Sequence, residues 1–262
     1  MARTGLEVQI AAIKALFFRE MKTRFGHYRL GYIWAVVEPA LHMSVMLLIF
    51  TYIRDRSMTG ISYAVFLVNG VIVFSLFSHI VNNAMHAVNS NRGLFDYRPI
   101  HPIDTVLARA FLETVLSSGV YLFFMILLTL LGEQFVIVDL LTLVSATALL
   151  IILSCGLGLG LMVVSALYPE GTKPLPVILH TLYFLSGVLF PLYRIPYQYQ
   201  YYVTWNPLLH AIELIRRSSI PGYEKYVMRD ISLIYLMECT IVLLFFGLAL
   251  YRTQQEEILR RE

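Results

Sequence analysis

The chain has 262 residues, of which 58% are apolar and only 14% are charged. Soluble domains carry about 25% charged and about 45–50% apolar residues, so the composition excludes a soluble globular protein and indicates an integral membrane protein. Six spans of about 20 residues fit within this length and leave no room for a separate large soluble domain. The net charge of +3 is small, and its placement along the chain is more informative than its size.

The first predicted element is an amphipathic helix over residues 1–25, within an N-terminal region that we place at 1–30. The apolar residues that recur there at spacings of three or four are Leu6, Ile10, Ile13, Phe17 and Met21. This spacing places them on one helical face. A helix with an apolar stripe and basic flanks is typical of the membrane interface. A short soluble helix packed on a partner fits the same pattern.

Six apolar segments follow, within one transmembrane domain over 31–262. Their approximate bounds are 32–53, 61–84, 105–131, 140–167, 174–192 and 231–251. In the fourth, Gly156 and Gly160 form a G-x-x-x-G pattern, which favours close helix packing in lipid. The predicted fold is therefore all-α integral membrane, with six transmembrane helices, an N-terminal interface helix and short re-entrant helices before the last span.

Positive charges near the ends of the spans predict the orientation. With the N-terminus inside, 13 Lys and Arg residues lie on the cytoplasmic side and 7 lie outside. This bias follows the positive-inside rule and predicts that both termini are cytoplasmic. Five of the seven outer charges fall within 193–230, which makes that segment unusual.

A short helix is predicted within this outer segment. Asn206-Pro207 is typical of an N-cap followed by Pro at the first helical position, and the helix should run to about Ser219, before Pro221-Gly222. A helix of this length is more typical of a re-entrant or interfacial element than of a span.

An aromatic face is predicted just before that helix. Tyr197, Tyr201 and Trp205 are spaced four residues apart and share one helical face. One interpretation is an aromatic belt at the lipid headgroups. The other is a pore mouth where flat rings contact sugar faces, and one surface can serve both purposes.

Charged residues inside predicted spans are candidates for a path through the membrane, because each is costly in lipid. Glu38 precedes Pro39 in the first span, and Glu238 lies in the middle third of the sixth. Arg109 and Glu113 are four residues apart in the third span, a spacing that favours a pair with each other.

The sequence carries no motif for nucleotide binding or catalysis. It has no G-x-x-x-x-G-K-[ST] run to hold phosphate, no H-E-x-x-H and no G-x-S-x-G. We expect no cofactor and no metal in this chain. His79 and His86 lie seven residues apart on one helical face, which favours packing or pore polarity over metal binding.

Three stretches resemble a known family. Residues 23–39, TRFGHYRLGYIWAVVEP, look like the start of the first span in ABC-2-type polysaccharide export permeases, most of all the capsule-export branch of KpsM type. Residues 91–99, NRGLFDYRP, followed by PID at 102–104, resemble that branch's cytoplasmic loop between spans two and three. Residues 206–216, NPLLHAIELIR, resemble the segment before the last span in the wider family.

The resemblance implies a homodimer in the bacterial inner membrane, with a channel at the interface of its two subunits. It implies a separate ATPase subunit that binds ATP and Mg²⁺ on the cytoplasmic side. The implied cargo is a lipid-linked capsular polysaccharide, passed to periplasmic and outer-membrane export proteins. No nucleic acid is expected as a partner, and membrane lipids are.

The resemblance and the residue patterns together predict which residues couple to the ATPase and which line the channel or gate. The loop at 91–99 would carry a short coupling helix, with apolar residues in a groove of the ATPase and polar residues as a rim. The coupling residues are Asn91, Arg92, Leu94, Phe95, Asp96 and Arg98. The segment 196–219 would form periplasmic gate helices. The channel or gate residues are Trp34, Glu38, Tyr197, Tyr201, Trp205, Arg216 and Arg217.

The charges of the outer segment have two interpretations. Clustered cations such as Arg216 and Arg217 raise the local concentration of an acidic polymer, although contact with headgroups would use the same charges.

Two alternative functions remain at this stage. An O-antigen or teichoic-acid exporter would have the same architecture. A membrane-embedded glycan-modifying enzyme would need paired carboxylates or a histidine-based site near the membrane surface, and the sequence assembles neither.

Overall fold

The computed structural model describes residues 5–25, 31–53, 61–91, 100–191, 195–228 and 230–260. Throughout these ranges the regular structure is helical and no strand is formed, which confirms the predicted all-α fold. The α-helices are α1 (Gly5–Phe25), α2 (Gly31–Ile53), α3 (Tyr63–Met85), α4 (Ala87–Asn91), α5 (Pro102–Leu130), α6 (Leu140–Leu167), α7 (Leu175–Leu185), α8 (Tyr197–Val203), α9 (Pro207–Ser219) and α10 (Leu233–Arg260). Two short 3-10 helices, η2 (Pro169–Thr172) and η4 (Tyr223–Tyr226), complete the set.

Four of these helices, α3, α5, α6 and α10, are long and apolar enough to cross a membrane. Each coincides with a predicted span, and α10 continues nine residues beyond the predicted end at 251. Helix α2 has 23 residues and matches the first predicted span. At 1.5 Å per residue its length is about 35 Å.

Helix α7 is shorter than the apolar segment predicted at 174–192. It has 11 residues, about 17 Å in length, against a hydrocarbon core of about 30 Å. The helix ends where Gly187 adopts a left-handed backbone, with φ of 65°. The apolar residues that follow, Val188 and Leu189, are buried in non-helical chain. The apolar segment at 174–192 therefore contains a short helix followed by non-helical chain that is buried within the protein.

Small residues bring α6 and α10 into close contact. A Cβ added to Gly156 would lie 2.7 Å from the backbone of Leu244 in α10. On the adjacent face of α6, a Cβ on Gly158 would lie 2.6 Å from the Cβ of Ala84 in α3. The interpretation of Gly156 as a packing residue is confirmed, because no larger side chain fits between these helices.

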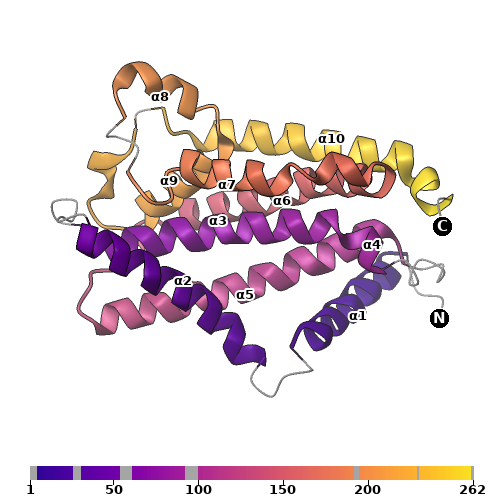
Figure 1. The fold of residues 1–262 in the computed structure, drawn as a ribbon, viewed down its shortest axis with the longest axis horizontal. Helices are drawn as coiled ribbons and strands as arrows, with labels where there is room; N and C mark the ends of the chain where they lie inside the picture. The colour runs from indigo at the N-terminus through magenta and orange to yellow at the C-terminus, as the bar shows by residue number, and fades with distance from the viewer. Residues whose placement is uncertain are drawn as a thin grey trace.

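The two ends of the helical bundle differ in what they carry. Figure 1 places the start of α1, helix α4 and the end of α10 at one end, and helices α8 and α9 toward the other. The start of α1 and the end of α10 therefore lie at the same end of the bundle as Asn91. Which side of the membrane this end faces stays a prediction.

Candidate functional site

The outer segment is held in place by a buried arginine in α9. Arg216 is 0% exposed. Its Nη1 donates hydrogen bonds to the carbonyl of Gly187 at 2.8 Å and to Oε1 of Glu213 at 3.0 Å. Its Nη2 donates to the carbonyl of Val188 at 2.9 Å. The guanidinium therefore connects α9 to the chain that follows α7.

The side chains around Arg216 stabilise its buried guanidinium. Its Cζ lies 3.6 Å from the centre of the Phe66 ring in α3. Both carboxylate oxygens of Glu213 also accept from the hydroxyl of the buried Tyr223, at 3.1 Å. A Cβ on Gly70 would meet the guanidinium and the Val188 carbonyl, so glycine is required at that position of α3.

This burial changes the interpretation of the two arginines predicted to attract a polymer. Arg216 has no exposed surface in this structure, where it forms an internal anchor. The side chain of Arg217 is 51% exposed, and its Nε lies 3.8 Å from Oε1 of Glu224. Of the pair, Arg217 alone presents a cation at the surface.

The predicted short helix is confirmed as α9, and its start is capped as expected. Asn206 accepts a hydrogen bond from the amide of Leu208 at 3.0 Å and donates to Oγ of Ser186 at 2.8 Å. Glycine at 222 has a φ of 75° just beyond the end of the helix. The N-cap side chain thus also fastens α9 to the end of α7.

The aromatic residues before α9 lie on the surface. Tyr201 is 62% and Trp205 is 65% exposed, and their ring centres are 6.0 Å apart in an edge arrangement. Tyr197 begins helix α8, and its side chain lies outside the described part. The hydroxyl of Tyr235 in α10 donates to the carbonyl of Trp205 at 2.9 Å. This exposed aromatic face is open to headgroups and to sugars alike.

The predicted coupling loop begins at the end of α4. Asn91 is buried, its Oδ1 accepts a hydrogen bond from Arg19 of α1, and its Nδ2 donates to the carbonyl of Ala87 at 2.9 Å. Asn91 is thus a tether between α1 and α4. The other predicted coupling residues, Arg92, Leu94, Phe95, Asp96 and Arg98, lie outside the described residues.

Polar pairs join α1 to the bundle. Arg109 of α5 pairs with Glu20 of α1 at 3.1 Å, and Glu113 of α5 pairs with Arg24 of α1. The predicted pair between Arg109 and Glu113 is replaced by these contacts, because α1 supplies an opposite charge to each residue. Sequence spacing within α5 could not identify partners 89 residues away.

Of the remaining predicted path residues, Trp34 and Glu38 are on α2, where Trp34 is 62% exposed and Glu38 is also exposed. Glu238 is exposed on α10. Figure 1 draws the start of α2 and helix α8 on opposite sides of the bundle, so one copy of this chain does not group the α2 residues with those of α8. Among the described residues, no cluster of three or more His, Cys, Asp and Glu side chains could hold a metal ion.

Sequence reasoning missed two contacts that the fold creates. One is the anchor formed by Arg216, Glu213 and Tyr223. The other joins Nδ1 of His79 to Oε2 of Glu113, which are 3.4 Å apart. The available signal was the presence of charged residues within apolar stretches, which are usually paired or face a polar cavity.

Comparison with known proteins places this architecture in a family. The family model described as ABC-2 type transporter matches residues 11–219. The polysialic acid transport protein KpsM of Escherichia coli is 51% identical over 99% of both chains. The capsule polysaccharide export inner-membrane protein CtrC of Neisseria meningitidis is 29% identical over 94% of this chain and 91% of its own. BexB of Haemophilus influenzae, which carries the same description, is 25% identical over 95% of this chain and 93% of its own. With a family match over most of its length and full-length relatives, this chain belongs to the ABC-2 type transporter family.

Proposed function

We propose that this chain is the permease subunit of an ABC exporter that moves capsular polysaccharide across the bacterial inner membrane. The observation that carries the proposal is the 51% identity to a polysialic acid transport protein over 99% of both chains. An O-antigen export permease of Myxococcus xanthus matches only 30% of this chain. Capsular polysaccharide is therefore favoured over O-antigen as the cargo.

The energy for export comes from a separate ATPase subunit. The sequence has no P-loop, while its family is that of ATP-driven transporters. The ATPase docks at the end of the bundle that carries α4 and the loop after Asn91. This end, together with both termini, faces the cytoplasm, in keeping with the excess of Lys and Arg on that side.

Six segments span the membrane in this proposal: α2, α3, α5, α6, α7 with the buried chain after it, and α10. The buried chain at 188–191 extends the reach of α7, and such non-helical backbone is tolerated at membrane depth where protein covers it. Helix α1 lies at the cytoplasmic interface, where Glu20 and Arg24 pair with Arg109 and Glu113 of α5. The subunit lacks an internal repeat, so two copies form the channel between them.

The cargo is a lipid-linked acidic polysaccharide, handed to periplasmic and outer-membrane export proteins. Helices α8 and α9 form the outer gate, and Tyr201, Trp205 and Arg217 are the residues that meet the polymer. Replacing Tyr201 and Trp205 with alanine should make the idle channel leak ions when matched amounts of protein are reconstituted. If the variants lose stability and expression without a leak, these rings anchor the segment at the headgroups and do not seal a gate.

The direct test is complementation. A capsulate bacterium whose permease gene has been deleted should regain surface polymer when this chain is expressed with its ATPase, and polymer should accumulate inside cells without it. Expression with an ATPase inactivated in its nucleotide site is the matched control. Restored assembly of the complex without any surface polymer would contradict the assignment of the cargo.

A further inference from the structure

Helix α3 is the most buried of the four long apolar helices, yet one of its faces is open. The polar residues on this face lie three or four residues apart over the second half of the helix and just beyond it. They are Ser75, Ser78, His79, Asn82 and His86, which we call the α3 polar face. His79, Asn82 and His86 are exposed, and Ser75 and Ser78 are half-buried.

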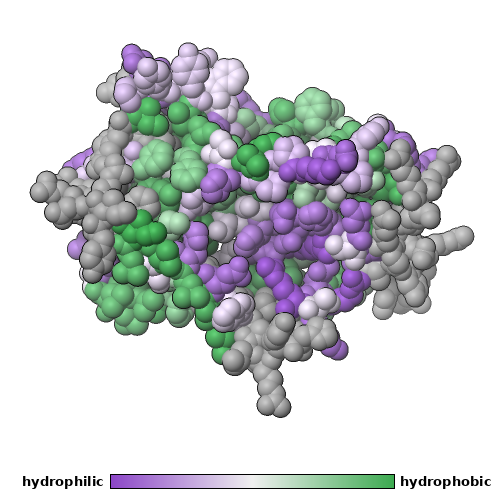
Figure 2. Space-filling view, viewed as in Figure 1, coloured by the Kyte–Doolittle hydropathy of each residue, from purple (hydrophilic) through white to green (hydrophobic). Residues whose placement is uncertain are grey.

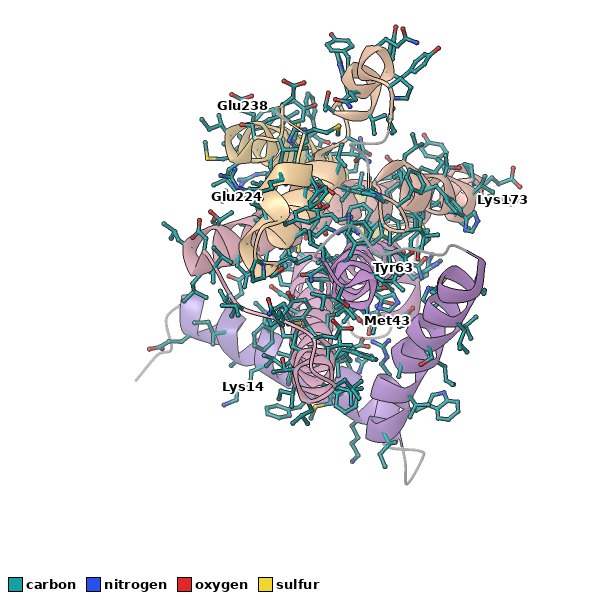
Figure 3. All side chains as sticks on the ribbon, turned by 90° about the vertical axis from the view of Figure 1, so that its left-hand side faces the viewer. Lys14, Met43, Tyr63, Lys173, Glu224 and Glu238 are labelled. Atoms are coloured by element: carbon teal, nitrogen blue, oxygen red, sulfur yellow. The ribbon has the colours of Figure 1, made fainter. Side chains whose placement is uncertain are left out.

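This face has a different character from the surfaces that suit lipid. Helices α5 and α10 expose large apolar side chains such as Leu122, Ile126 and Phe245. Figure 2 shows hydrophilic residues gathered where Figure 1 draws the second half of α3, between α7 above and α5 below. Figure 3, turned by 90°, draws α3 nearly end-on, with α7 to its upper right and α2 to its lower right. Because polar side chains are costly in hydrocarbon, this face must meet water, protein or a polar cargo.

The imidazole of His79 is held in one orientation. Its Nδ1 lies 3.4 Å from Oε2 of Glu113, whose side chain is only 3% exposed. The other carboxylate oxygen of Glu113 accepts from Arg24 and, at 2.8 Å, from Asn83. The side chain of His79 is 51% exposed, so a ligand on the open side can reach the ring. A carboxylate that binds one ring nitrogen commonly fixes the role of the other.

The charges around this face favour an anionic or hydroxyl-rich ligand. Among the described residues, the carboxylate paired with His79 of this face is Glu113, which is covered and also paired with Arg24, whose side chain is 43% exposed. The exposed groups are therefore an amide, two imidazoles and a guanidinium. Hydrogen-bonding groups spaced one by one along a helix suit a polymer that must slide past them.

We propose that the α3 polar face contacts the sugar hydroxyls and carboxylates of the acidic polymer in the cytoplasmic half of the path, and that His79, positioned by Glu113, is a specificity-determining contact. The inference rests on the proposed function, because a polymer must pass between the two subunits. It adds the surface of this chain on which the cargo slides.

Cysteine labelling tests where the face lies. The variants Asn82→Cys and, as a control on the apolar surface of α5, Ser118→Cys are made in a background with Cys155→Ala and Cys239→Ala that still exports. In the complex with its ATPase, a membrane-impermeant maleimide added from the cytoplasmic side should label Asn82→Cys and should not label Ser118→Cys. Polymer held in the channel by inactivating the ATPase should slow the labelling of Asn82→Cys at least fivefold. Labelling that is absent, or unchanged by trapped polymer, overturns the inference.

Export by substituted chains tests the role of His79. His79→Leu should lower export at least tenfold at unchanged protein amount and ATPase binding, whereas His79→Gln, which keeps a hydrogen-bonding group, should retain most of it. Normal export by His79→Leu overturns the inference. The proposed function fails separately, since it requires that the unsubstituted chain restore surface polymer in the deletion strain. If the unsubstituted chain restores surface polymer but the variants do not behave as predicted, the inference about the α3 polar face is wrong and the proposed function stands.

Discussion

Arg216 in the outer segment is either a structural anchor or a contact for the polymer. The variant Arg216→Ala decides between these two accounts. The substitution removes hydrogen bonds to the Gly187 and Val188 carbonyls and leaves the carboxylate of Glu213 buried without its cation. Removing one partner of a buried ion pair costs about 3–5 kcal/mol. Because proteins are only marginally stable, this cost is a large share of the total free energy of unfolding. We therefore expect little folded Arg216→Ala protein.

The matched control is Arg217→Ala, one residue further along α9. Its cation is exposed and lies 3.8 Å from Glu224, and exposed pairs contribute about 0–1 kcal/mol. The double variant Glu213→Leu with Arg216→Met should recover part of the lost stability, because it removes both buried charges.

The assay is thermal aggregation of detergent-solubilised protein, followed by size-exclusion chromatography at matched concentration. Arg216→Ala should aggregate at a clearly lower temperature than the unsubstituted chain, and Arg217→Ala should match it while exporting less acidic polymer. If Arg216→Ala is as stable as the unsubstituted protein and loses only export, Arg216 contacts the polymer and the anchor account is refuted.

Three further predictions follow from particular contacts. Gly156→Ala should destabilise the protein by about 1–3 kcal/mol through overpacking against α10, whereas Gly119→Ala, whose Cβ would have nothing within 4 Å, should not; thermal melting of the two variants compares them. His210, in the non-spanning helix α9, has its pKa lowered by burial, while Nε2 donates to the Thr204 carbonyl and Nδ1 accepts from the Ser232 amide. The neutral imidazole thus contributes stability above its ordinary pKa of 6.5, and this contribution is lost as the pH falls through the lowered value. Between pH 7.5 and pH 5 the melting temperature should therefore drop more in the unsubstituted chain than in His210→Gln. Equal drops would contradict this. Phe95→Ala should weaken ATPase association or uncouple hydrolysis from export, and normal co-purification with normal export would remove the coupling role.

The elements that sequence reasoning predicted well are those governed by local chemistry. Long apolar runs located α3, α5, α6 and α10, because a helix that satisfies its own backbone is what such runs form in lipid. Asn206-Pro207 located α9, because capping depends on neighbouring residues alone. The fifth apolar run was less informative, since composition cannot distinguish a helix from buried chain held by Arg216.

The site was harder to predict because its contacts are distant in sequence. Arg216 reaches the carbonyl of Gly187, 29 residues away, and Arg24 reaches Glu113, 89 residues away. Helical spacing suggested that His79 and His86 share a face, and the structure leaves both exposed. It could not show that Glu113 holds one of the imidazoles.

The central claim is that this chain carries acidic capsular polysaccharide when its ATPase partner hydrolyses ATP. The most direct measurement uses inside-out membrane vesicles that contain the permease and the ATPase, with lipid-linked polymer added outside. Polymer should become protected from an added glycan hydrolase only when ATP is present and both subunits are active. If the assembled complex hydrolyses ATP and the polymer stays fully accessible to the hydrolase, the account of this chain as a capsule exporter is contradicted.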